Sequence, residues 1–168
     1  MVNLRFQIYN LRIRMRRLIY GTVAVSLLSM NLMAYDAEKA EELSKFYSHM
    51  TQKTCADSKL FIKADEALKM LREKKKFTFL DVRTEGENAI LGLNGGNALH
   101  IPINILFKKE NLDKLSADNP IVIVCHSGTR ATLAAIGLKR LGFKKVHVVK
   151  GGMVALAKAT NPKNAPLK

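Results

Sequence analysis

The sequence predicts an α/β domain with a central parallel sheet flanked by helices on both faces. Short apolar segments alternate along the chain with segments whose apolar residues recur at helical spacing. Strands that are separated by helices in this way form parallel sheets. One apolar segment, 121–124, reads Ile-Val-Ile-Val without interruption. Such a continuous β-branched run is typical of a central strand that is buried on both faces.

Length and composition exclude several other classes of protein. A chain of 168 residues with 48% apolar and 25% charged residues is long enough for one domain with its own core. Ten glycines and four prolines exclude a collagen-like or low-complexity chain, and two cysteines are too few for a disulfide scaffold. The four histidines and two cysteines show no paired metal-ligand spacing. We therefore expect no metal and no other cofactor.

Residues 1–34 have the pattern of a secretory signal peptide. Five arginines and no acidic residue fall within the first seventeen residues, and an apolar stretch of 17 residues, 18–34, follows them. A basic segment, an apolar segment and a small residue at the exit define such a signal. We therefore expect cleavage after Ala34 and export to the periplasm, with an uncleaved inner-membrane anchor as the alternative. Met15 is the start that we favour, since two arginines then lead directly into the apolar segment.

This N-terminal segment contributes +5 to the net charge of +14. Cleavage removes five of the 28 basic residues and none of the 14 acidic ones, so the remaining chain is still basic. Its lysines occur in short groups without interleaved aromatic residues, which favours solvated faces over a nucleic-acid-binding surface. We expect no nucleic-acid partner, membrane contact only through an uncleaved N-terminal segment, and a surface that attracts small anions.

After the signal segment the sequence predicts three parts. Residues 35–59 form a lead-in, with an amphipathic helix over 37–50 that packs on the domain and a polar loop over 51–58. The domain itself spans 60–158, and residues 159–168 form a C-terminal tail.

Strand and helix patterns alternate within the domain. The expected strands are 60–62, 77–82, 100–105, 121–124 and 145–149. The expected helices are 64–75, 109–115 and 130–141, with a loop or broken helix over 85–97 and a Gly-Gly turn at 151–152. The third helix is expected to bury one face, formed by Leu133, Ile136, Gly137 and Leu141. Gly142 is placed to end that helix.

The candidate reactive residues lie together in one segment of the sequence. Cys125 follows the apolar strand 121–124, four loop residues follow it, and Arg130 opens the next helix. Ligands of open α/β sheets bind at this edge. Backbone N–H groups in such a turn, together with the helix N-terminus, hold an anion. A sulfur anion at Cys125 is therefore stabilised there as a nucleophile, and Gly128 lets the backbone curl around it.

These residues resemble the active-site loop of the rhodanese-type sulfurtransferases, whose pattern is Cys-x-x-Gly-x-Arg. Flanking segments agree with this resemblance. Residues 79–83 are similar to the family's Asp-Val-Arg segment, and Glu87 stands at the position of its downstream acid. Three further segments are similar to family motifs, namely 98–104, 142–143 and 149–153. The resemblance covers about residues 60–158 and implies a single rhodanese-like domain.

The resemblance implies a thiosulfate or polysulfide sulfurtransferase. In that family the cysteine, here Cys125, attacks a small anionic sulfur donor and then passes the sulfur from its persulfide to cyanide, a thiol or a protein acceptor. The loop that binds the persulfide anion consists of His126, Ser127, Gly128 and Thr129. Arg130 either binds the anionic donor or pairs with an acid. Asp81 and Arg83 are assigned structural support.

Several alternatives remain open. The protein is either this enzyme, a sulfur carrier that does not turn over, or an inactive module for protein contacts. A phosphatase or arsenate reductase is disfavoured, because four residues separate Cys125 from Arg130 whereas related phosphatases have five. Cys55 is either inert, a disulfide partner of Cys125 or of another chain, or a resolving thiol.

Overall fold

The computed structural model describes residues 12, 14, 15 and 34–160. The predicted signal segment therefore lies almost entirely outside the described residues. Among the residues that are described, no helix has both the length and the apolar character needed to cross a membrane. The chain divides into two compact units between residues 49 and 50. In the first unit, α2 (Ala37–Tyr47) begins at Asp36, whose carboxylate accepts a hydrogen bond from the N–H of Lys39 at 3.1 Å.

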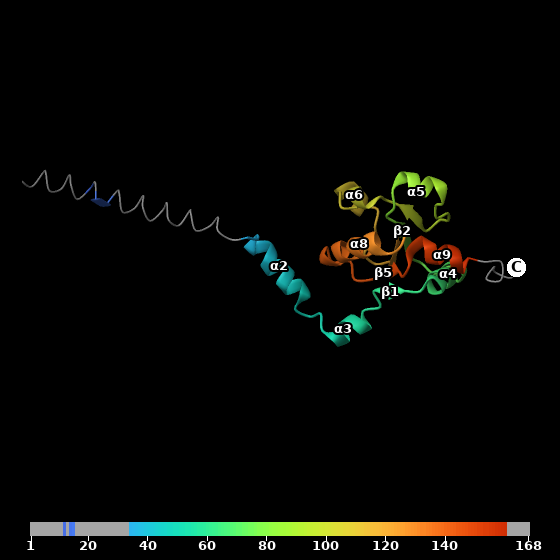
Figure 1. Cartoon of the computed structure of the whole chain (residues 1–168), viewed down its shortest axis with the longest axis horizontal. Helices are drawn as coiled ribbons and strands as arrows, with labels where there is room; N and C mark the ends of the chain where they lie inside the picture. Colours follow the sequence, from blue (N-terminus) through green and yellow to red (C-terminus); the bar gives the residue numbers. More distant parts are fainter. Residues whose placement is uncertain (1–11, 13, 16–33, 161–168) are drawn as a thin grey trace, which may run out of the picture. The chain divides into compact units, whose positions relative to one another are not determined.

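The second unit is built on a five-stranded parallel sheet, which confirms the predicted fold class (Figure 1). Along the chain its strands are β1 (Phe61–Ile62), β2 (Thr78–Asp81), β3 (Ala98–His100), β4 (Ile121–Val124) and β5 (Val146–Val149). Their order across the sheet is β1-β5-β4-β2-β3, and every neighbouring pair is parallel. In the register, Asp81 on β2 is paired with Val124 on β4 and with His100 on β3. The carboxyl ends of these three strands thus lie level at one edge.

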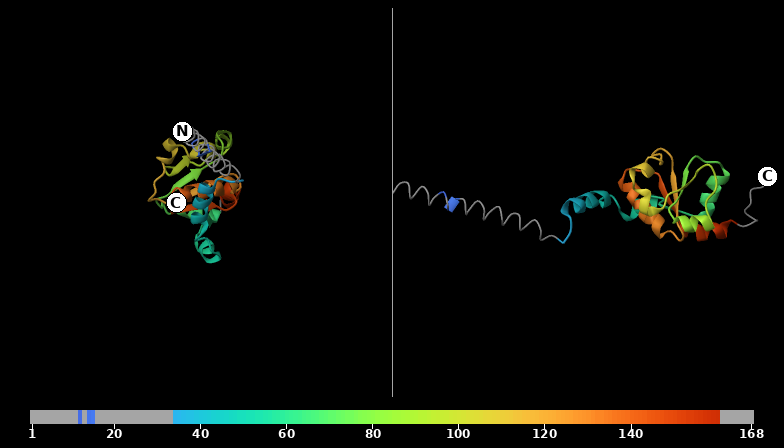
Figure 2. Two further views of the ribbon diagram at one scale, coloured as in Figure 1. Left: turned by 90° about the vertical axis from the view of Figure 1, so that its left-hand side faces the viewer. Right: turned by 90° about the horizontal axis from the view of Figure 1, so that it is seen from above.

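Helices cover both faces of the sheet (Figure 2). One layer contains α6 (Ile103–Leu106), α7 (Lys109–Leu112) and α8 (Thr129–Arg140), and the other contains α4 (Ala64–Arg72) and α9 (Gly152–Ala159). Successive strand residues point to opposite faces. In β4, Ile121 and Ile123 pack against the first layer, and Val122 and Val124 pack against the second. This two-sided burial explains why β4 is apolar at every position.

The lead-in to the sheet contains a helix where the sequence predicts a loop. Residues 52–57 form α3 (Gln52–Asp57). Two threonines begin this helix by capping each other. The N–H of Thr54 donates to the hydroxyl of Thr51 at 3.2 Å, and the N–H of Thr51 donates to the hydroxyl of Thr54 at 2.8 Å. The prediction of a loop over 51–58 is therefore wrong, because it overlooked this reciprocal cap.

Two further expectations are wrong at the sheet edge. The strand predicted over 100–105 ends at His100, and α6 begins at Ile103. Pro102 separates the two elements, since a residue without an N–H cannot extend the strand ladder but can precede a helix. After the predicted Gly-Gly turn, the chain continues as α9, for which no helix is expected from the sequence. The broken helix expected over 85–97 is the short α5 (Glu85–Ile90).

The helix α8 buries a different face from the predicted one. Its buried residues are Ala131, Ala134, Ala135 and Leu138. Leu133 and Leu141 are 60% and 56% exposed, so the prediction that both are buried is wrong. Three alanines let the helix backbone lie close to the sheet, a contact that a search for large apolar residues overlooks. Gly142 follows the last turn with φ of +96°, so it ends the helix as predicted.

Shortening Leu138 is expected to test which face of α8 is buried. Leu138→Ala leaves a cavity in the core and is expected to lower the free energy of unfolding by about 2–5 kcal/mol. Leu133→Ala removes the same atoms from an exposed position of the same helix and is expected to cost less than about 0.5 kcal/mol. Urea unfolding followed by circular dichroism measures both values. Equal losses in the two variants would contradict the burial described for α8.

Candidate active site

Cys125 lies immediately after the central strand β4, in the turn that leads into α8. The residue is buried, with 1% of its surface exposed. Its sulfur atom Sγ accepts a hydrogen bond from the backbone N–H of Gly128 at 3.1 Å. Gly128 has φ of +116°, a left-handed conformation that favours glycine and curls the backbone around the sulfur. The side chains of His126 and Ser127 are exposed, so the backbone of the turn surrounds the sulfur.

The turn also places the N-terminus of a helix beside the sulfur. Thr129 and Arg130 belong to the first turn of α8, where backbone N–H groups have no acceptor within the helix. The aligned peptide dipoles give this end of the helix a partial positive charge. The turn therefore offers both N–H donors and a favourable electrostatic potential to an anion carried on Cys125.

Two backbone hydrogen bonds join the N-terminus of α9 to the turn that contains Cys125. The N–H of Met153 donates to the carbonyl oxygen of Cys125 at 2.8 Å, and the N–H of Val154 donates to that of His126 at 3.2 Å. Gly152 makes this approach possible. A Cβ atom on Gly152 would overlap the carbonyl oxygens of both Cys125 and His126, and the residue has φ of +58°. Position 152 therefore requires glycine for space as well as for conformation.

Arg130 is fixed by a two-point ion pair with Glu87 on α5. Its Nη1 and Nη2 atoms donate to the two carboxylate oxygens of Glu87 at 2.7 Å and 2.6 Å. These hydrogen bonds, followed by one from the N–H of Thr84, hold the pKa of Glu87 well below its usual value. The same hydrogen bonds raise the pKa of Arg130, with smaller contributions from negative charge at Cys125 and Asp81. Arg130 is thus a fixed cation close to Cys125, paired with an acid.

A buried ion pair between Arg83 and Asp81 anchors α5 to the end of β2. Arg83 Nη2 donates to the carboxylate of Asp81 at 2.6 Å and to the carbonyl oxygen of Leu91, just beyond α5, at 2.5 Å. A ring nitrogen of His100 lies 2.9 Å from the carbonyl oxygen of Arg83. Because α5 carries Glu87, this anchor also positions the carboxylate that holds Arg130.

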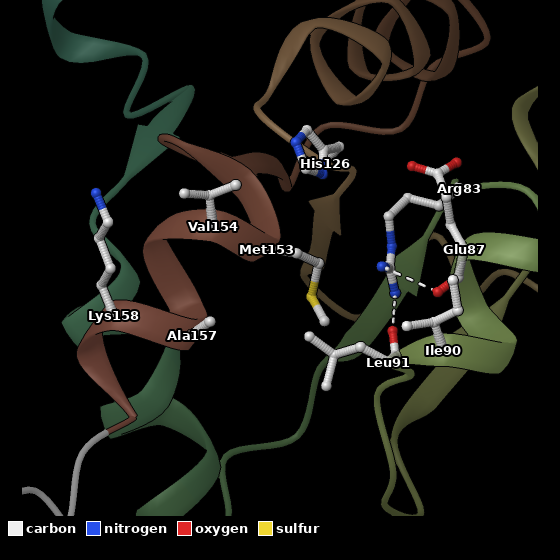
Figure 3. A pocket seen from close by; sticks show the side chains of 9 residues that line it. All are labelled: Arg83, Glu87, Ile90, Leu91, His126, Met153, Val154, Ala157 and Lys158. Carbon is white, nitrogen blue, oxygen red and sulfur yellow. Dashed lines mark hydrogen bonds between the residues drawn. The ribbon is translucent and has the colours of Figure 1, made fainter.

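A groove of about 540 Å³ lies beside the turn, between α5 and α9 (Figure 3). His126 contributes to it from the turn, Ile90 and Leu91 from α5 and its C-terminal end, and Met153 from α9. These residues other than His126 are not expected at the site from the sequence. The signal that would have found the α9 side is the helical spacing of Met153, Leu156 and Ala157, after the Gly-Gly pair.

The remaining candidates for reactive or metal-binding groups are the second cysteine and clusters of His, Cys, Asp or Glu side chains. Cys55 on α3 is exposed, Cys125 is buried, and both are free thiols. Among the described residues, no three His, Cys, Asp or Glu side chains come together in an arrangement that would hold a metal ion.

The fold and the site define a parallel α/β domain whose central strand ends in a cysteine turn at the N-terminus of a helix. Residues 63–159, more than half of the chain, match the family described as "Rhodanese-like domain". The chain therefore belongs to the rhodanese-like domain family.

Named relatives agree with this assignment. The chain is 38% identical to "Putative sulfurtransferase YtwF" of Bacillus subtilis over 104 residues, which cover 61% of this chain and 86% of that protein. It is 33% identical to "Probable adenylyltransferase/sulfurtransferase MoeZ" of Mycobacterium tuberculosis over 88 residues, which cover 52% of this chain but only 22% of MoeZ. A "Rhodanese-like Domain Protein" from Staphylococcus aureus has a similar structure, with a TM-score of 0.50 and 29% identity, covering 64% of this chain and 97% of that one.

Gly152→Ala is expected to displace the Cys125 turn, because the new methyl group would overlap two carbonyl oxygens of that turn. Gly142→Ala is the matched control, since it adds the same methyl group at a positive φ where nothing lies within 4 Å. We expect Gly142→Ala to lower the free energy of unfolding by about 1 kcal/mol, and Gly152→Ala to cost about 1–3 kcal/mol more. Urea unfolding measures both losses. Losses of the same size would show that α9 does not crowd the turn.

Glu87→Gln removes the carboxylate that Arg130 binds and is expected to destabilise the fold at neutral pH. Because the pKa of Glu87 is lower in the folded chain than in the unfolded chain, the unfolded chain binds more protons between these two pKa values. The contribution of the pair is therefore complete above about pH 4.5, the ordinary glutamate value, and is lost as the pH falls towards the folded pKa.

The stability difference between the wild type and Glu87→Gln is thus expected to be constant from about pH 7 to about pH 5 and to shrink below this range. Urea titrations across the pH range measure it. Glu110→Gln is the control, because Glu110 forms no ion pair with another described residue. A difference that persists unchanged to about pH 3 would contradict the lowered pKa of Glu87.

Proposed function

We propose that this protein is a sulfurtransferase that carries sulfane sulfur as a persulfide on Cys125. The observation that carries the proposal is the position of the sulfur atom at the end of the central strand. There it accepts the N–H of Gly128 at 3.1 Å and lies beside the N-terminus of α8. Preorganised donors of this kind stabilise negative charge on a reacting sulfur without rearranging. Relatives that are named as sulfurtransferases also support the proposal.

The proposed reaction has two steps. In the first, the Cys125 thiolate attacks the outer sulfur of thiosulfate, a polysulfide or another persulfide. A new S–S bond forms at Sγ, and the S–S bond of the donor breaks, so that its electron pair leaves with the first product. In the second, cyanide or a thiol attacks the outer sulfur of the Cys125 persulfide. The S–S bond at Sγ breaks, and its electron pair regenerates the thiolate.

Each residue of the turn has a proposed role in these steps. The backbone N–H groups of His126, Ser127, Gly128 and Thr129 hold the anionic outer sulfur. Arg130 supplies a fixed positive charge whose position is set by Glu87, at hydrogen-bond distances of 2.6–2.7 Å. Asp81 and Arg83 support the site through the anchor of α5 and take no part in the bond changes.

We propose that the protein acts in the periplasm. The basic and apolar segments within residues 1–34 support export, and an uncleaved anchor in the inner membrane is the alternative. Outside the cytoplasm, thiosulfate and polysulfide are the donors that the proposal favours.

Loading of sulfur onto Cys125 tests the proposed function directly. The full chain is reduced, incubated with thiosulfate or polysulfide, and examined by intact mass spectrometry. We expect a gain of one sulfur atom in the wild type and in Cys55→Ser, complete loss of that gain in Cys125→Ser, and its removal by cyanide or a thiol.

The other outcomes separate the alternatives. A persulfide that forms on Cys125 but is not discharged by cyanide or small thiols would support a sulfur carrier. No adduct in any freshly reduced chain would contradict persulfide chemistry and would favour a module for protein contacts.

A further inference from the structure

The groove beside the Cys125 turn is larger than inorganic sulfur substrates require. Its volume is about 540 Å³, within the range of pockets that bind organic molecules of drug size. Thiosulfate and cyanide contain only a few non-hydrogen atoms and would leave most of this space to water. The groove therefore has the dimensions of a site for an organic substrate.

The walls of the groove are apolar although they face solvent. Ile90 is 88% exposed, and Leu91 and Val154 are 50% and 40% exposed. Figure 3 shows Met153 of α9 and Leu91 pointing towards one another across the groove. Exposed apolar side chains that gather around a hollow mark a binding surface, since burying them in contact with a ligand is favourable. The body of the ligand is thus expected to be apolar.

One charged side chain of the groove has no ion-pair partner among the described residues. Arg83 is paired with Asp81, and Glu87 is paired with Arg130. Lys158 is exposed and forms no ion pair with a carboxylate of the described residues. It follows Val154 by four residues and so lies on the same face of α9. In Figure 3, Val154 lies between His126, next to the nucleophile, and Lys158.

We propose that the groove binds an organic thiol acceptor that has an apolar body and an anionic end group. Its thiol meets the persulfide at the Cys125 turn, its body lies against Ile90, Met153 and Val154, and its anionic group meets Lys158. The rise of α9 from Val154 to Lys158 is about 6 Å, which fits a chain of several methylene groups. This inference rests on the proposed function and specifies its acceptor.

The transfer balances without a further reagent. The acceptor thiol R–SH attacks the outer sulfur of the anionic persulfide Cys125–S–S⁻, and the proton of the thiol passes to the transferred sulfur. A new S–S bond forms in R–S–SH, the S–S bond at Cys125 breaks, and its electron pair remains on Sγ as the thiolate. The groove contributes only by binding the organic group R. It therefore changes the rate of transfer to thiols that differ in R and leaves the rate of transfer to cyanide unchanged.

The test compares four acceptors for the persulfide of the full chain: mercaptohexanoate, mercaptohexanol, mercaptoacetate and cyanide. For the wild type, we expect kcat/KM for mercaptohexanoate to exceed that for mercaptoacetate by about tenfold or more, because its additional methylene groups are partly buried. It is also expected to exceed that for mercaptohexanol, which has the same chain without the anionic group.

Single substitutions test the apolar contribution of the groove walls and the charge contribution of Lys158 separately. Ile90→Ser is expected to reduce the advantage of the long chain several-fold, whereas Leu133→Ser, an exposed leucine outside the groove, is expected to keep it. Lys158→Gln is expected to remove the preference for mercaptohexanoate over mercaptohexanol, and Lys144→Gln is its control. All of these variants are expected to load sulfur and to react with cyanide at the wild-type rate.

Failure of the acceptor proposal is distinct from failure of the proposed function. A chain that loads sulfur and transfers it to cyanide, but shows no preference among the three thiols, would overturn the acceptor proposal alone. Groove variants that behave like Leu133→Ser and Lys144→Gln would overturn it as well. A wild-type chain that takes up no sulfur on Cys125 would overturn the proposed function.

Discussion

The site depends on the close approach of α9 to the Cys125 turn. Two N–H groups at the start of α9 donate to the carbonyl oxygens of Cys125 and His126, at 2.8 Å and 3.2 Å. Because these carbonyl oxygens point towards α9, the N–H groups on the opposite side of the turn point towards the sulfur, as that of Gly128 does. The approach is possible only because Gly152 has no side chain, and a single methyl group there would occupy the space of both oxygens. These two backbone hydrogen bonds thus set the conformation of the turn that carries Cys125.

The charges around Cys125 are arranged in pairs that run from the sheet to the turn. Asp81 at the end of β2 holds Arg83, Arg83 holds the C-terminal end of α5, and Glu87 of α5 holds Arg130. The Asp81–Arg83 pair is buried, and a buried ion pair adds little net stability but fixes the position of its members. The Glu87–Arg130 pair is partly exposed. Since Arg130 is already paired, an anion on the sulfur is stabilised mainly by N–H groups and the helix end.

The sequence predicts the features that depend on local patterns. The β-branched run 121–124 predicts the central strand, and the cysteine at its end predicts the reactive turn. Other features depend on contacts that local patterns do not contain. The buried face of α8 consists mainly of alanines, which a search for large apolar residues overlooks. Arg130 and Glu87 are 43 positions apart in the sequence. From the sequence alone, Arg130 could therefore be assigned either to the anionic donor or to an acid, and the fold identifies the acid as Glu87.

The turn and the groove divide the proposed chemistry between different elements. The turn between β4 and α8 encloses one sulfur atom, and its conformation is set by backbone contacts that tolerate little change. Among the groove residues, Met153 of α9 is buried in the core. The other apolar positions of the groove are exposed, as the 88% exposure of Ile90 illustrates. Substitutions there change the surface offered to a substrate and leave the core and the nucleophile in place. In a fold of this kind, the reaction is thus determined by β4 and α8, whereas the choice of substrate depends on residues that the fold itself does not require.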